Sequence, residues 1–288
     1  MIERFFILTN LRKDPDLKVT WEVIDYLTGR GITCCRVQSW EERIGGLAGA
    51  DPEKDVLLVL GGDGTVLDAV SRLRGFPLPI LGVNLGTLGY LTEIDLASYK
   101  QTLDMVLQGD YKIQDRMMLE CRKGEADEIR SYALNDIVVA RHGALRMLCL
   151  NIYVDDEFLC AVSADGVILS TPTGSTAYNL SAGGPIIEPS AEMIVITPVC
   201  AHGLNIHSIV LPADARVSVE IGQSAHSADI EAEVSFDGSR KGLLKLGDRI
   251  EIRRSERTTR LITMKGKSFL QTLQRKLYQV ETGMRTGK

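Results

Sequence analysis

The sequence is poor in residues that build metal sites and disulfide frameworks. Its 288 residues include 4 His and 6 Cys, and no Cys-x-x-Cys or His-x-x-x-His spacing occurs among them. This excludes the common structural zinc sites and a disulfide-stapled scaffold. Isolated cysteines predict free, buried thiols in a reducing compartment.

Positive charge and long apolar runs are also lacking. The net charge is −5, so composition indicates neither nucleic acid nor an anionic membrane as a partner. No apolar run approaches the roughly 20 residues of a membrane-spanning helix, and no signal-peptide pattern follows Met1. We therefore expect a soluble, cytoplasmic protein. One basic cluster occurs, and we expect it to guard a solvated strand edge, with nucleic-acid binding as the alternative. Its members are Arg253, Arg254, Arg257 and Arg260.

The first 110 residues alternate between strand and helix patterns. Residues 4–10, 55–60 and 78–84 are apolar without alternation, which is typical of parallel strands buried on both faces. Helices are predicted after Asp14-Pro15 and after Gly64. Their expected buried faces are Leu17, Trp21, Ile24 and Leu27 in the first, and Val66, Leu67, Val70 and Leu73 in the second. The pattern predicts a Rossmann-like α/β domain over 1–110.

Residues 111–265 change character and predict a β-rich, β-sandwich-like domain. Short strands are expected at 147–154, 158–162, 166–169, 216–221, 233–236 and 249–253. Asp155-Asp156-Glu157 is typical of a hairpin turn. A closing helix over 266–280 should pack back on the first domain. Its expected apolar stripe is Phe269, Leu270, Leu273, Leu277 and Val280.

The segment Gly61-Gly62-Asp63-Gly64-Thr65 joins a predicted strand to a predicted helix. Glycines allow phosphates to approach the backbone, and a helix N-terminus offers free N–H groups. A carboxylate at this place would repel phosphates unless it binds a metal or takes a proton, so Asp63 indicates phosphoryl transfer. The alternative is a plain Gly-Asp turn, which asparagine would suit equally well. On this basis alone, Asp63→Asn should leave stability nearly unchanged.

Two further segments carry candidate ligand contacts. Asn84-Leu85-Gly86-Thr87-Leu88-Gly89-Tyr90 follows a strand, and Tyr90 is either a ring that stacks on a base or an ordinary packed aromatic. Asn135-Asp136 precedes the strand residues 137–139 and is either a turn or a pair that grips ribose hydroxyls.

The most unusual stretch is Thr171–Pro185, which carries many hydroxyl side chains and no lysine or arginine. Hydroxyls donate and accept without charge, which suits sugar hydroxyls, phosphates and amides of a nucleotide. Helix capping by Ser175 or Thr176 is the alternative, but it explains one hydroxyl and not five.

Together these segments resemble the NAD kinase family over most of the chain. The resemblance rests on Gly61–Thr65, Asn84–Leu91, Asn135-Asp136, Asp165-Gly166 with Thr171–Pro185, and 197–212 with His202 and Leu204. Diacylglycerol and sphingosine kinases share the first motif, whereas Thr171–Pro185 separates this chain from them. Two positions depart from the family pattern: Ile206-His207-Ser208 stands where arginine and proline are usual, and Ser239 where glutamine is frequent.

The resemblance implies transfer of the ATP γ-phosphoryl group to the adenosine 2′-hydroxyl of NAD. Asp63 would be catalytic, and Gly61, Gly62, Gly64 and Thr65 would bind the ATP phosphates. NAD contacts are implied at Asp63, Gly64, Tyr90, Asn135, Asp136, Arg146, Asp165, Thr173, Thr176, Ala177, Tyr178, Asn179, Leu180 and Ser181. A divalent cation, Mg²⁺ by expectation, would arrive with ATP without a dedicated protein cage.

The resemblance also implies a homodimer or homotetramer. Two other functions stay open from sequence: a lipid or sphingoid-base kinase with the same glycine motif, and a non-catalytic NAD(P)-binding regulator.

Overall fold

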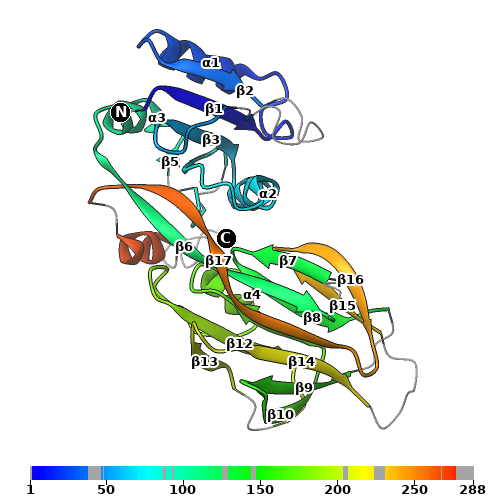
Figure 1. Cartoon of the computed structure of the whole chain (residues 1–288). Helices are drawn as coiled ribbons and strands as arrows, with labels where there is room; N and C mark the ends of the chain where they lie inside the picture. The colour runs from blue at the N-terminus through cyan, green and yellow to red at the C-terminus, as the bar shows by residue number, and fades with distance from the viewer. Residues whose placement is uncertain are drawn as a thin grey trace, which may run out of the picture. The chain divides into compact units, whose positions relative to one another are not determined.

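The computed structural model describes residues 2–37, 47, 49–86, 89–92, 94–124, 129–143, 147–203, 207–223, 231–266 and 268–276, without the side chains of 240 and 241. The chain divides into two compact units (Figure 1). Unit 1 comprises Met1–Asp115 with Thr259–Lys288, and unit 2 comprises Arg116–Thr258. Residues 259–265 cluster with unit 1, where Leu261 pairs with Ile80 of a parallel strand.

Unit 1 is built on a parallel sheet. Its strands are β1 (Arg4–Thr9), β2 (Thr33–Arg36), β3 (Asp55–Gly61), β4 (Ile80–Asn84) and β5 (Ile94–Asp95). The spatial order is β2-β1-β3-β4-β5. The chain moves to one side from β1 to β2 and to the other side from β3 to β4, so the order reverses between β1 and β3. Ligands of such sheets bind at this switch point, beyond the carboxyl ends of the strands.

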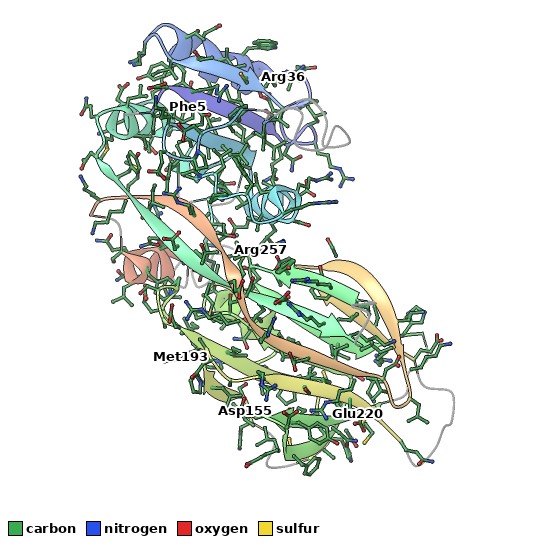
Figure 2. All side chains as sticks on the ribbon, in the orientation of Figure 1. Phe5, Arg36, Asp155, Met193, Glu220 and Arg257 are labelled. Carbon is green, nitrogen blue, oxygen red and sulfur yellow. The ribbon has the colours of Figure 1, made fainter. Side chains whose placement is uncertain are left out.

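Helices cover both faces of this sheet. They are α1 (Lys18–Thr28), α2 (Asp63–Leu73) and α3 (Tyr99–Leu107). A further helix over 269–276 belongs to unit 1, where its Phe269 and Lys276 lie beside Tyr90. Val23 of α1 and Leu103 of α3 share one apolar cluster with the strand residues Phe5 and Leu58. Successive side chains of a strand point to opposite faces, so Leu57, next to Leu58 in β3, points to the other face of the sheet, where α2 packs. The Rossmann-like prediction is confirmed, and Figure 2 shows Phe5 on its strand in this unit.

The predicted helix faces need correction. Trp21 is 50% exposed, and the buried positions of α1 are Thr20, Val23 and Leu27. Asp14 causes this rotation, because its carboxylate accepts hydrogen bonds from the backbone N–H (2.9 Å) and the hydroxyl (2.7 Å) of Thr20 and so holds a polar residue inward. In the helix over 269–276, Leu270 is 69% exposed. Leu277 and Val280 lie outside the described residues.

Unit 2 is a β-sandwich, as predicted. Its strands are β7 (Ile129–Ala133), β8 (Asp136–Arg141), β9 (Leu148–Val154), β10 (Glu157–Ala164), β11 (Gly166–Ser170), β12 (Met193–Val199), β13 (Ile209–Pro212), β14 (Val217–Gly222), β15 (Glu231–Phe236) and β16 (Ser239–Lys245). The larger parts of β6 (Tyr111–Lys123) and β17 (Arg249–Met264) also belong to it, and both strands continue into residues of unit 1. One layer has the order β13-β12-β11-β8-β15-β16, and the other has β10-β9-β14-β17, with β6 beside β17 and β7 beside β6. A single apolar core joins the inner faces of both layers. A short helix, α4 (Tyr178–Ser181), follows β11.

The predicted hairpin turn joins β9 to β10. Asp155 and Asp156 have φ of 49° and 68°, as a two-residue type I′ turn requires. All six cysteines are free, as expected, but only Cys121 is buried and Cys200 is exposed. Among the described residues, no helix combines the length and apolar character needed to cross a membrane.

The basic cluster on β17 does not guard a strand edge, so that prediction is wrong. β17 lies inside its layer, between β14 and β6. Arg254 pairs with Glu192, and Arg260 pairs with Glu53.

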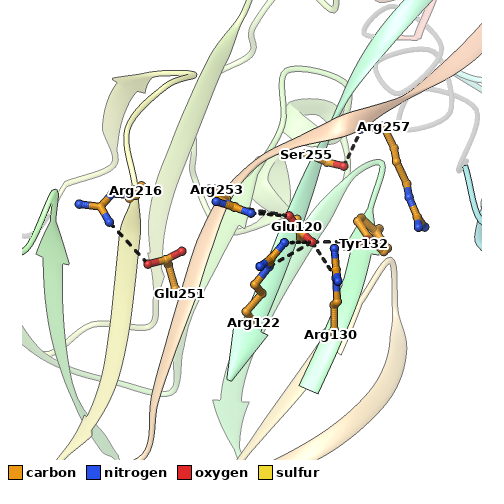
Figure 3. A network of polar contacts seen from close by, with 9 residues as sticks. All are labelled: Glu120, Arg122, Arg130, Tyr132, Arg216, Glu251, Arg253, Ser255 and Arg257. Atoms are coloured by element: carbon orange, nitrogen blue, oxygen red, sulfur yellow. Dashed lines mark hydrogen bonds and ion pairs between the residues drawn. The ribbon is translucent and has the colours of Figure 1, made fainter. Parts of the chain in front are cut away.

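The centre of the network in Figure 3 is Glu120, whose carboxylate lies within 3.2 Å of guanidinium nitrogens of Arg122, Arg130 and Arg253. Burial raises the pKa of Glu120, but the hydrogen bonds from Arg122, Arg253 and Arg130, with the charge of Arg122, together outweigh burial and lower that pKa below its usual range. Arg257 stacks on the Tyr132 ring at 4.0 Å. These guanidinium groups are therefore committed to partners within the sandwich.

Candidate active site

The two glycine segments of unit 1 meet at the carboxyl ends of neighbouring strands. Gly61 ends β3 and Asn84 ends β4, and the two residues are paired in the sheet. The backbone N–H of Leu85 donates to the Gly61 carbonyl at 2.8 Å. The buried Asn84 amide closes a turn by donating to the Gly86 carbonyl (2.9 Å) and accepting from its N–H (3.1 Å).

Asp63 anchors the second segment. It is the first residue of α2, and its Oδ1 accepts hydrogen bonds from Leu91 N (3.1 Å), Thr92 N (3.0 Å) and Thr92 Oγ1 (2.9 Å). Its Oδ2 accepts from Tyr90 N at 2.7 Å. A Cβ on Gly89 would collide with this carboxylate. The structure thus corrects the expectation that asparagine could replace Asp63 at no cost, because an amide NH₂ in either position would confront backbone donors.

Tyr90 is half-buried and already packed. The Lys276 ammonium lies 3.8 Å from the centre of its ring, and the Phe269 ring is 6.5 Å away, so a base could stack only on ring surface that these residues leave open. Burial raises the Tyr90 pKa, and the negative charge of Asp63 adds to the effect. Burial lowers the Lys276 pKa, against an opposing effect of Asp63. Lys276 is a cation that the motifs did not reveal.

A cavity of about 420 Å³ opens beside the start of α2, at the switch point of the sheet. Arg12 follows β1 and Arg36 ends β2, and both line the cavity with Gly64 and Thr65. Figure 2 marks Arg36 at this end of β2. The Thr65 Oγ1 accepts a hydrogen bond from Asn10 at 3.0 Å, which ties the helix start to the loop after β1. Asp68 also lines the cavity, but its carboxylate is paired with Arg72 at 2.9 Å. The two arginines and the helix N-terminus therefore make this a cavity suited to an anion.

Lys13 lies between the two glycine segments. A Cβ on Gly62 would be 2.9 Å from the Lys13 Nζ, and one on Gly86 would be 3.2 Å from it. Glycine at these positions therefore leaves room for an ammonium group beside the backbone. Arg12, Lys13 and Arg36 escaped the sequence analysis because they belong to no motif and are collected only by the sheet order.

In unit 2, the Asn135-Asp136 pair lies against the hydroxyl-rich segment. The Thr171 hydroxyl donates to the Leu134 carbonyl (2.6 Å), and the Thr171 N–H donates to the Asn135 carbonyl (2.9 Å). A Cβ on Gly174 would collide with Asn135 backbone atoms. Both segments are candidate ligand contacts by sequence, and in the structure they lie together.

Asp136 is buried at the start of β8, 5% exposed, beside a second aspartate. Asp237 accepts hydrogen bonds from the backbone N–H groups of Leu134 (2.8 Å), Asn135 (2.7 Å) and Asp136 (3.2 Å). Burial, together with the negative charge of Asp237, raises the Asp136 pKa to about 7. Burial also raises the Asp237 pKa, although its three backbone hydrogen bonds oppose this.

Side chains of the hydroxyl-rich segment fall into two groups. Ser175 and Asn179 are fully buried: the Ser175 hydroxyl bridges Pro172 and Ile187, and the Asn179 amide bridges Ser175 and Pro185. These two side chains shape the segment, so a ligand could meet Asn179 only through its backbone. Tyr178 and Ser181 are exposed, and Thr176 and Leu180 are partly exposed. Thr173 is buried and Ala177 is partly exposed.

Three further predicted positions are Asp165, Arg146 and Leu204. Asp165, at the turn between β10 and β11, pairs with Arg141 at 3.0 Å. Arg146 and Leu204 lie outside the described residues. Among the residues that the structure describes, no group of three or more His, Cys, Asp or Glu side chains could hold a metal ion.

Both units of the chain are similar to NAD kinases. Residues 7–111 match the family model of the ATP-NAD kinase N-terminal domain, and residues 134–264 match that of the C-terminal domain. The NAD kinase of Lachnospira eligens is 40% identical over 292 residues, covering 95% of this chain and 99% of that protein. That of Geotalea daltonii is 42% identical over 229 residues, covering 78% and 79%.

Solved structures show the same likeness. The yeast NADH kinase, crystallised with NADH, superposes with a TM-score of 0.78 at 27% identity, covering 94% of this chain and 86% of that one. An Archaeoglobus fulgidus NAD kinase in complex with ATP superposes at 0.73 and 22% identity, covering 91% and 94%, and at that identity it supports the fold.

The raised Asp136 pKa predicts a pH-dependent stability. The folded state retains this proton up to about pH 7, whereas an unfolded aspartate loses it near pH 4, so the stabilisation present below pH 4 is lost as pH rises through 7. The loss is at most about 1.4 kcal/mol per pH unit. Asp136→Asn removes the titrating group, so the variant should gain several degrees in Tm relative to wild type between pH 5 and pH 8. Melting curves at both pH values test this, and a Tm difference independent of pH would contradict it.

Proposed function

This chain belongs to the ATP-NAD kinase family, and we propose roles for its residues in that reaction: residues of unit 1 bind the ATP phosphates, Asp63 is catalytic, and the hydroxyl-rich segment of unit 2 binds NAD. The chain is an NAD kinase, a phosphotransferase. The reaction moves the γ-phosphoryl group of ATP to the adenosine 2′-hydroxyl of NAD and yields NADP and ADP. We place the reaction at Asp63 because this residue holds the two glycine segments together at the carboxyl ends of β3 and β4.

The ATP phosphates would bind at the switch point of unit 1. Gly62 and Gly64 leave backbone accessible at the start of α2, and Thr65 lines the cavity there. Gly61, the buried last residue of β3, precedes them. Arg12, Lys13 and Arg36 supply positive charge that the motif itself lacks. Helix N-termini and arginine forks are the usual partners of phosphate oxygens.

Asp63 would act on the 2′-hydroxyl. The 2′-oxygen attacks the γ-phosphorus, the bond from that phosphorus to the β,γ-bridging oxygen breaks, and ADP leaves with the bridging oxygen. The proton of the hydroxyl passes to the Asp63 carboxylate. Its Oδ2 accepts one hydrogen bond, from Tyr90 N, and therefore keeps a lone pair for this proton, whereas Oδ1 already accepts three.

A divalent cation, Mg²⁺ in this proposal, would bind with ATP. The open lone pair of Asp63 Oδ2 would hold either this cation or the proton, so binding the cation is the alternative to the role of base. No cluster of ligand side chains lies in the part of the chain that the structure describes. When bound, the cation neutralises charge on the phosphates. Lys13 and the two arginines would share that electrostatic task.

The proposed NAD contacts are assigned residue by residue, as the family resemblance implies. In unit 1 these are Asp63, Gly64 and Tyr90. In unit 2 they are Asn135, Asp136, Asp165, Thr173, Thr176, Ala177, Tyr178, Asn179, Leu180 and Ser181, with Arg146 carried by resemblance alone. The exposed Tyr178 and Ser181 offer side chains to a ligand, whereas Asn179 offers backbone.

The comparisons do not support the two rival functions. Both halves of the chain match NAD kinase domains, and the matched relatives are NAD kinases and not lipid kinases or regulators. A homodimer or homotetramer and a cytoplasmic location stay predictions that rest on the family resemblance and the composition.

Product analysis is the first test of this function. With ATP, Mg²⁺ and NAD, the purified protein should form NADP, and a chelator should stop the reaction. Diacylglycerol in place of NAD should give no phosphorylated product. Absence of NADP after long incubation at high enzyme concentration would refute the function.

The cations at the switch point give a second test. Lys13→Ala and Arg36→Ala should each raise the KM for ATP about tenfold and change the KM for NAD less than about threefold, because each removes one charged contact to phosphate. Lys18→Ala removes an exposed lysine of α1 nearby and is the matched control. Equal effects of Lys13→Ala and Lys18→Ala would remove Lys13 from the ATP site.

Asp63→Asn should separate chemistry from anchoring. Loss of the base should lower kcat by roughly 10²–10⁴. The amide also leaves backbone donors of residues 90–92 unpaired, so the free energy of unfolding should fall by about 1–3 kcal/mol. Steady-state kinetics and denaturant unfolding of the same preparation measure both effects.

Two controls accompany this variant. Asp95→Asn alters a carboxylate that accepts hydrogen bonds from Ser98 N (2.8 Å) and Ser98 Oγ (2.7 Å) at the start of α3, and should leave kcat unchanged. Thr92→Val removes one hydrogen bond to Asp63 but keeps the carboxylate, so it should cost stability and little kcat. A folded Asp63→Asn enzyme with near-normal kcat would defeat the role of base.

A further inference from the structure

Asp237 occupies the tip of a tight hairpin in unit 2. Phe236 of β15 pairs with Ser239 of β16, so Asp237 and Gly238 form a two-residue turn. Both have positive φ, 48° for Asp237 and 75° for Gly238, as a type I′ turn requires. The turn lies beside the start of β8, because Phe236 also pairs with Ile137.

From this position the Asp237 side chain accepts three consecutive backbone N–H groups. Oδ2 accepts from Leu134 at 2.8 Å, and Oδ1 accepts from Asn135 at 2.7 Å and from Asp136 at 3.2 Å. The backbone N–H of Asp237 in turn donates to the Asp136 carbonyl at 3.0 Å. The hairpin tip and the segment 134–136 are therefore joined by four hydrogen bonds.

The backbone conformation alone does not call for aspartate. Asparagine and glycine adopt positive φ at least as readily, and both are common in type I′ turns. Acceptance of three N–H groups by two oxygens does call for a carboxylate, since asparagine has one acceptor oxygen and would turn its NH₂ toward a donor. The residue type thus follows from what the side chain holds.

The segment that Asp237 holds is itself part of the candidate NAD site. On its other side, the Leu134 and Asn135 carbonyls accept hydrogen bonds from Thr171, at the start of the hydroxyl-rich segment. N–H groups of 134–136 are fixed by Asp237, and two of their carbonyls by Thr171. The direction in which the Asn135 side chain leaves the backbone is thereby set.

We propose that Asp237 is a positioning residue for NAD: it clamps the backbone of 134–136 so that Asn135 and Asp136 meet the ligand in one fixed arrangement. This inference rests on the proposed function, in which that pair contacts NAD. Asp237 acts by holding the backbone of 134–136, and it does not act on the reacting atoms.

The charge of Asp237 gives a second, independent consequence. Asp136 carries a raised pKa, caused by burial and by Asp237. In β11 the neighbour of Asp136 is Ser170, which is uncharged. On the β15 side Phe236 lies opposite Ile137, and Asp237, which follows it, donates its backbone N–H to the Asp136 carbonyl, so Asp237 is the charged group that faces Asp136 from this side. Removal of the Asp237 charge should therefore move the titration of Asp136, and any dependence of NAD binding on it, to lower pH.

The test compares Asp237→Asn with Asp155→Asn. Asp155 also has positive φ in a type I′ turn of unit 2 and accepts a backbone N–H, that of Arg216, at 3.0 Å, but it belongs to no ligand segment. Figure 2 marks it at the hairpin of β9 and β10. Asp237→Asn should raise the KM for NAD about tenfold, with kcat and the KM for ATP within about threefold. The pH at which the KM for NAD changes should fall, and Asp155→Asn should show neither effect.

A double-mutant cycle with Asn135→Ala separates the possible failures. If Asp237 acts by holding the backbone of 134–136, then adding Asp237→Asn to Asn135→Ala should raise the KM for NAD little further. Normal NAD affinity in Asn135→Ala and Asp136→Asn would overturn the assignment of Asn135 and Asp136 to the NAD site, and the proposal with it. A raised KM in those variants but a normal one in Asp237→Asn would overturn the proposal alone.

Hydrogen exchange keeps the test decisive if Asp237→Asn folds poorly. Asp237→Glu retains the charge but displaces the carboxylate. It should therefore raise the KM for NAD, while the pH at which this KM changes should stay the same. Amides of 134–136 should exchange faster in this variant, and amides of β9 and β14 should not. Unchanged exchange at 134–136 would overturn the proposal.

Discussion

Each unit of this protein depends on one carboxylate that accepts a run of backbone N–H groups. Asp63 holds residues 90–92 in unit 1, and Asp237 holds residues 134–136 in unit 2. A buried N–H without an acceptor costs roughly 1–3 kcal/mol, so segments without regular pairing need such a partner. A carboxylate meets several of these demands at once, and its charge strengthens each bond.

The same arrangement explains why glycines surround the candidate site. A Cβ on Gly89 would strike the Asp63 carboxylate, and one on Gly174 would strike the backbone at Asn135. At Gly62 and Gly86 the space admits the Lys13 ammonium instead. Glycine thus serves close approach of a carboxylate, of a backbone and of a cation, and at none of these four positions is a positive φ the reason.

Charge is distributed differently in the two units. In unit 1, Arg12, Lys13 and Arg36 gather at the switch point beside exposed backbone, which suits a polyanion. In unit 2, the arginines of β17 are committed to carboxylates and a ring, and the candidate ligand segment relies on hydroxyls and amides. This difference supports phosphate binding by the first unit and binding of a largely uncharged moiety by the second.

The sequence by itself determined the fold class and the family, and it marked the candidate ligand segments. Unbroken apolar runs marked the parallel strands, and the spacing of hydroxyls marked 171–185, because these patterns are local. Tertiary structure alone decided what those segments contact. Sheet order brought Arg12 and Arg36 to one cavity, Asp14 turned Thr20 inward where Trp21 was expected, and Asp237 reached across more than a hundred residues to the turn at 134–136. Such contacts depend on which strands become neighbours, and hydrophobic periodicity along one strand carries no information about its neighbour.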